Sequence, residues 1–87
     1  MNRNEFEKIQ DELQKKIGMW KIVIGEESLA DFVIGCFFDN TNNQWKVYIN
    51  NEKGRHRIRL QTGVEGLAFD KLLSMINFEI ENNTYIS

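Results

Sequence analysis

The sequence contains very little cysteine or histidine, and no proline, among its 87 residues. The single cysteine, Cys36, has no partner in the chain for a disulfide. One thiol and the one imidazole, that of His56, are also too few to fill the four positions of a structural zinc site. Cys36 lies in the apolar stretch 32–38, so we interpret it as a small buried hydrophobic side chain rather than a reactive thiol.

Long hydrophobic runs are missing as well. The first twenty residues are polar and charged, without the apolar segment of a secretory signal. No stretch approaches the ~20 consecutive apolar residues that a membrane-spanning helix needs. We therefore expect a cytoplasmic protein without membrane contact, folded as a single α+β domain over residues 1–87.

Catalytic motifs are equally scarce. His56 stands alone, whereas a general base needs a positioned partner and a nucleophile needs a base. Ser28 and Ser74 lack the flanking glycines of a nucleophile elbow. No calcium-binding loop, phosphate-binding loop or dinucleotide fingerprint is found. The sequence thus predicts a protein that is not an enzyme, with no catalytic residue, no metal site and no cofactor.

Two helices are predicted, one at each end of the chain. In the first, apolar residues recur every three or four positions, and Asn4 with Glu7 has the spacing of a capping box. In the second, Thr62 with Glu65 has the same spacing, and an apolar stripe continues to about Asn77. Residues 78–87 are left open as a hairpin, an extra strand or a frayed tail.

Four segments between the helices have the composition of strands: 19–24, 32–38, 45–49 and 55–61. Short turns separate them, so we predict an antiparallel meander with both helices packed on one face. The second segment is apolar on both faces, which is typical of a strand covered on both sides. In the last, His56, Ile58 and Leu60 alternate with arginines and are expected to face the helices.

The sheet face opposite the helices is the predicted binding surface. Residues 40–63 carry five basic side chains against one acidic side chain, although the net charge of the chain is −2. Arginine and tyrosine are enriched in protein interfaces. We therefore expect the protein-binding residues to be Lys21, Lys46, Tyr48, Arg55, Arg57 and Arg59. The simpler interpretation is that long basic side chains merely coat an exposed sheet face.

Three segments resemble small immunity proteins of polymorphic toxin systems in Gram-positive bacteria. They are Trp45-Lys46-Val47-Tyr48, Glu52-Lys53-Gly54 and the helical segment Thr62-Gly63-Val64-Glu65-Gly66-Leu67-Ala68-Phe69-Asp70-Lys71-Leu72-Leu73. The resemblance covers residues 13–76. It implies a cytosolic protein that neutralises a cognate protein toxin by tight binding. The matching residues are a strand, a turn and a helix, so no toxin-contacting residue is transferred.

Two other functions remain open from the sequence. A small nucleic-acid-binding module could use the same basic face, but the chain as a whole is acidic, whereas phosphate binding usually involves a basic domain. A self-associating structural domain would instead bury its apolar strand faces in a homodimer. The first would show affinity that falls steeply with salt, and the second would show twice the expected mass in solution.

Overall fold

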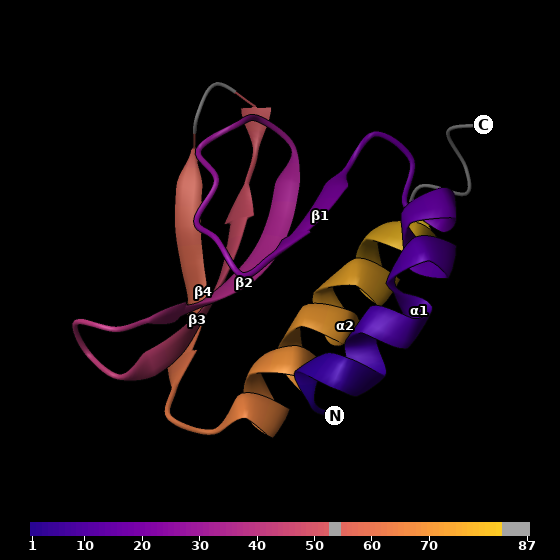
Figure 1. Ribbon diagram of the computed structural model, residues 1–87. Coiled ribbons are helices and arrows are strands. Elements are labelled where there is room, and N and C mark those ends of the chain that lie inside the picture. The colour runs from indigo at the N-terminus through magenta and orange to yellow at the C-terminus, as the bar shows by residue number, and fades with distance from the viewer. Residues whose placement is uncertain (53–54, 83–87) are drawn as a thin grey trace.

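The computed structural model describes residues 1–52 and 55–82, and it has two helices and a four-stranded sheet (Figure 1). In chain order the elements are α1 (Arg3–Lys16), β1 (Lys21–Ile24), β2 (Val33–Asp39), β3 (Gln44–Asn50), β4 (His56–Thr62) and α2 (Glu65–Asn82). The two helices lie together on one face of the sheet. The predicted α+β class and the order of the elements are confirmed.

The strands lie in the order β1-β2-β3-β4, and the sheet is mixed. β2 with β3 and β3 with β4 are antiparallel, as predicted. β1 pairs with β2 in parallel, so the prediction of a wholly antiparallel meander is wrong at this edge. β1 has only four residues and rises about 13 Å, so residues 25–32 are long enough to lead the chain back to the start of β2.

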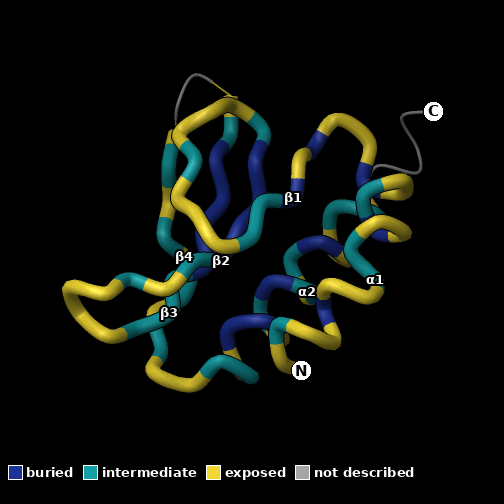
Figure 2. The backbone as a smooth tube through the Cα atoms, viewed as in Figure 1, coloured by how far each residue is buried: buried dark blue, intermediate teal, exposed yellow. Residues whose placement is uncertain are grey.

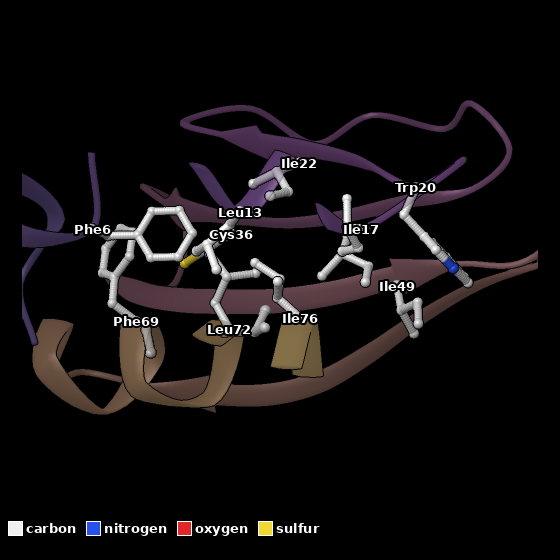
Figure 3. Close-up of a cluster of buried hydrophobic side chains, with 13 residues drawn as sticks. Phe6, Leu13, Ile17, Trp20, Ile22, Cys36, Ile49, Phe69, Leu72 and Ile76 are labelled. Carbon is white, nitrogen blue, oxygen red and sulfur yellow. The ribbon is translucent and has the colours of Figure 1, made fainter. Parts of the chain in front are cut away.

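The hydrophobic core lies between the helices and the sheet face that they cover (Figure 3). Phe6 of α1 packs against Phe69 of α2, with ring centroids 5.7 Å apart. Cys36 of β2 is fully buried among these side chains, as predicted, and burial raises the pKa of its thiol to about 12. Each large apolar side chain buried here contributes roughly 1.5–3 kcal/mol to folding.

The start of α1 and the end of α2 differ from the predicted bounds. α1 begins two residues early, because Asn2 rather than Asn4 accepts a hydrogen bond from the backbone N–H of the third helical residue, Glu5, and completes the capping box. α2 continues to Asn82, so no strand or hairpin begins at residue 78. Ile80 packs against the core one turn after Ile76, which extends the apolar stripe. The remainder of the open segment, residues 83–87, lies outside the described residues.

Candidate protein-binding site

The sheet face away from the helices is covered by the connection between β1 and β2. We call residues 25–32 the crossover loop; Figure 2 shows this largely exposed segment in front of buried stretches of β2 and β3. The first four residues of β2, residues 33–36, are therefore buried between the helices and this loop. The apolar composition of both faces of β2 follows from that position.

Three of the six predicted binding residues lie on this covered face. Lys21 is exposed at β1, whereas Tyr48 of β3 is fully buried. Lys46 forms an ion pair with Asp39, its Nζ lying 2.8 Å from Oδ2. This contact, together with a hydrogen bond from the backbone of Thr41, holds the pKa of the Asp39 carboxyl below its usual value. The expectation of one open surface on this face is therefore wrong.

Two of the three arginines do not lie on that face. Arg55 is exposed and precedes β4, while Arg57 pairs with Ile49, whose side chain belongs to the core beneath the helices. Cross-strand partners project to the same face of a sheet, so Arg57 lies on the helix side. Arg59 borders a hollow that it shares with α2, which places it on the helix side as well.

A β-bulge in β4 explains why Arg57 and Arg59 lie on the helix side of the sheet and not on the predicted face. Leu60 lies opposite Val47, yet Ile58 rather than Arg59 lies opposite the next residue, Tyr48. Arg59 is therefore an extra residue in β4, and an extra residue reverses the alternation of all side chains on one side of it. Leu60 faces the helices as predicted, whereas Ile58 turns away from them.

The hydroxyl of Tyr48 attaches the crossover loop to the sheet. It donates a hydrogen bond to the carbonyl of Glu26 at 2.9 Å and accepts one from the backbone N–H of Ser28 at 2.9 Å. The ring of Phe37 on the neighbouring strand meets the tyrosine ring edge-on, with centroids 5.8 Å apart. Tyr48 is thus a structural residue, and its predicted place in an exposed interface is corrected.

Asn50 and His56 complete this attachment. The buried amide of Asn50 donates hydrogen bonds to the carbonyls of Ser28, at 2.6 Å, and Ala30, at 2.9 Å. Its oxygen therefore accepts from Nδ1 of His56, and Nε2 of that histidine lies 2.8 Å from the carboxylate of Glu27. His56 turns away from the helices because of the bulge, so its predicted inward position is wrong.

Sequence reasoning missed Asn50 because it was assigned to the turn after β3. The signal was available in the alternation of that strand. Lys46, Tyr48 and Asn50 occupy every second position and share one face. A polar residue at the end of such a series can bond to whatever segment covers the face, but the sequence does not reveal which segment that is.

Arg59 of β4 instead lies beside α2, at the edge of the helical layer. A hollow of about 240 Å³ lies between these elements. We define the β4–α2 surface by four residues that line the hollow, Arg59, Lys71, Met75 and Phe78, together with Arg57, the cross-strand partner of Ile49, which also lines it. Phe78 is 61% exposed, which is the largest exposed fraction among the six phenylalanines.

The cations of the β4–α2 surface have no ion-pair partner in the part of the chain that the structure describes. Among residues 1–52 and 55–82, no ion pair includes Arg57, Arg59 or Lys71. One acid, Glu79, also borders the hollow; burial raises the pKa of its carboxyl, and a hydrogen bond from Trp20 acts in the opposite direction. The surface thus combines three unpaired cations with an exposed aromatic ring.

No family model matches this chain, and no curated protein or solved structure proves similar to it. In the part of the chain that the structure describes, no three histidine, cysteine, aspartate or glutamate side chains gather as metal ligands would. None of the helices described there has the length and apolar character needed to cross a membrane.

Proposed function

We propose that this chain is a protein-binding domain of the immunity type, which neutralises a cognate bacterial toxin in the cytoplasm by direct contact. The β4–α2 surface is the proposed contact site. The observation that carries the proposal is the exposed ring of Phe78 at the rim of the same hollow as two cations, Arg59 and Lys71, that have no ion-pair partner among the described residues.

This combination has the chemistry of an interface. Aromatic and arginine side chains dominate the binding energy of protein complexes, whereas lysine and acidic residues are usually found at the rim. An exposed apolar group beside a hollow loses contact with water when a partner covers it, which stabilises the complex. Binding of this kind would inhibit a toxin by covering the surface that it needs for its own activity.

The charges and the apolar side chains have separate roles in this proposal. Arg57, Arg59 and Lys71 attract a partner of opposite charge and increase the association rate. Phe78 and Met75 become buried in the complex and slow its dissociation. Weakening the charges should therefore make association slower and less dependent on salt, while truncating Phe78 should mainly raise the dissociation rate.

A co-expression experiment tests the proposal. The product of the gene next to that of this chain, as the candidate toxin, is expressed in a bacterial host, with and without the chain, and colony survival is counted. We expect the wild type to protect and Phe78→Ser to lose protection. Leu29→Ser is the matched control, because Leu29 is 71% exposed but lies on the crossover loop. Equal killing with and without the wild-type chain would rule out neutralisation of that toxin.

A further inference from the structure

We infer that the partner contributes an extended, acidic segment that pairs with the free side of β4 and places an apolar side chain in the hollow beside Phe78. The inference rests on the proposed function and specifies the chemistry of the partner segment. It combines three observations. These are the position of β4 at the edge of the sheet, the cations along it that have no ion-pair partner among the described residues, and the hollow beside it.

β4 has one free side. It pairs with β3, and no other strand among the described residues pairs with it, so it forms an edge of the sheet (Figure 1). Its seven residues extend about 23 Å, which is long enough to receive a further strand. An extended peptide can add to such an edge through main-chain hydrogen bonds, while its side chains provide specificity.

The charge along β4 selects the partner. Arg57 lies on the helix side of the strand, and a residue opposite it on an added strand would lie roughly 5 Å away. A second copy of this chain pairing through β4 would bring arginines close to arginines, which is unfavourable. An acidic segment would instead neutralise Arg57 and Arg59, which have no ion-pair partner within the described residues.

The bulge at Arg59 and the hollow define where the apolar anchor would lie. Arg59 borders the hollow together with Ile49, Met75 and Phe78. Charged side chains and a bulge hinder an edge strand from pairing with an arbitrary neighbour. The arginines select a segment that supplies carboxylates opposite them, and the hollow favours one apolar side chain between Met75 and Phe78.

The test uses the full chain and a library of displayed random twelve-residue peptides as the probe. We expect selection at low salt to enrich peptides in which acidic and apolar residues alternate. The affinity of a synthetic representative should fall at least tenfold for Arg57→Glu/Arg59→Glu, because two attractive charge contacts become repulsive. Lys8→Glu/Lys21→Glu makes the same change in net charge at exposed positions of α1 and β1, and should change the affinity less than twofold.

Main-chain pairing is tested separately from charge. N-methylation of every second peptide amide should abolish binding when the methylated amides face β4, and should leave it intact when the other set is methylated. Amide exchange in residues 56–62 should slow on binding. Binding that survives methylation at every position, or selection that yields no acidic peptide, would overturn the inference.

These outcomes differ from a failure of the proposed function. If the chain protects cells from the toxin and Arg57→Glu/Arg59→Glu protects equally well, the proposed function stands and the acidic-segment inference is wrong. If acidic peptides bind β4 but the chain gives no protection, the inferred recognition chemistry stands and toxin neutralisation is wrong.

Discussion

The ring of Tyr48 occupies the space that Gly35 leaves open on the neighbouring strand. The two residues are cross-strand partners in β2 and β3. A Cβ atom at position 35 would lie 2.5 Å from both Cζ and Oη of the tyrosine. The missing side chain at Gly35 therefore allows the Tyr48 hydroxyl to reach the backbone of the crossover loop at Glu26 and Ser28.

Gly35→Ala should destabilise the protein by about 1–3 kcal/mol, because the added methyl group forces the buried tyrosine ring to move. The free energy of unfolding, measured in urea, gives this directly. Gly63→Ala is the matched control, since nothing lies within 4 Å of a Cβ at that position, and it should change the stability by less than about 0.5 kcal/mol. Equal effects at the two glycines would contradict the proposed packing.

Asn50→Asp should destabilise the protein by about 1–3 kcal/mol, although the two side chains have nearly the same volume and the hydrogen bond from His56 is kept. The substitution removes the donors that hold Ser28 and Ala30 and sets a buried negative charge against two carbonyl oxygens. Urea unfolding and amide exchange within the crossover loop measure the effect. Asn4→Asp is the control: it is exposed in the first turn of α1, where an acid is favourable, and should cost nothing.

The thiol of Cys36 should be unreactive in the folded protein. Burial raises its pKa from 9.0 to about 12, so almost no thiolate forms near neutral pH. A thiol-specific reagent at pH 8 should modify the urea-unfolded chain rapidly and the native chain slowly, and equal rates would contradict the buried position.

The same shift makes stability depend on pH. The folded state holds the Cys36 proton more tightly than the unfolded chain does. The resulting contribution to the free energy of unfolding is complete below pH 9.0 and is lost as the pH rises toward about 12. The wild type should therefore lose more stability than Cys36→Ala between these values, as measured by urea unfolding. Parallel curves for the two proteins would show that the thiol does not contribute.

The ion pair of Asp39 with Lys46 should stabilise the protein only while the carboxylate is charged. Folding lowers the pKa of the Asp39 carboxyl from 3.8. The stabilisation by the ion pair is therefore present above pH 3.8 and is lost as the pH falls through the pKa of the folded state. The difference in unfolding free energy between the wild type and Asp39→Asn should shrink below pH 3.8. A difference that stays constant with pH would exclude a role for this charge.

Most of the secondary structure could be predicted because its signals are local. The apolar stripe of α1 ends at Gly18, whose φ of 72° is a conformation that glycine adopts readily. The choice between Asn2 and Asn4 as the cap was not decided by the sequence, because a glutamate follows each of them at the same spacing. The error of two residues at the start of α1 is expected for that reason.

The faces of the β4 arginines and the direction of β1 were predicted wrongly because both depend on contacts between residues far apart in the sequence. Nothing in the segment 55–61 marks Arg59 as the extra residue, because the bulge exists only relative to β3. The parallel pairing of β1 likewise depends on how the crossover loop is held by Tyr48 and Asn50, far along the chain. A single bulge moved two arginines to the helix side, so the predicted set of residues was divided between two faces.

Site-specific photo-crosslinking tests the central claim most directly. A photoreactive phenylalanine analogue is placed at position 78, or at position 29 as the control, and each protein is irradiated in cells that also make the neighbouring toxin. Both positions are exposed in the free protein, but only Phe78 lies on the β4–α2 surface. We predict a crosslink to the toxin from position 78 and none from position 29. A crosslink from position 29 alone, or from neither position while the two proteins still co-purify, would contradict the proposed surface.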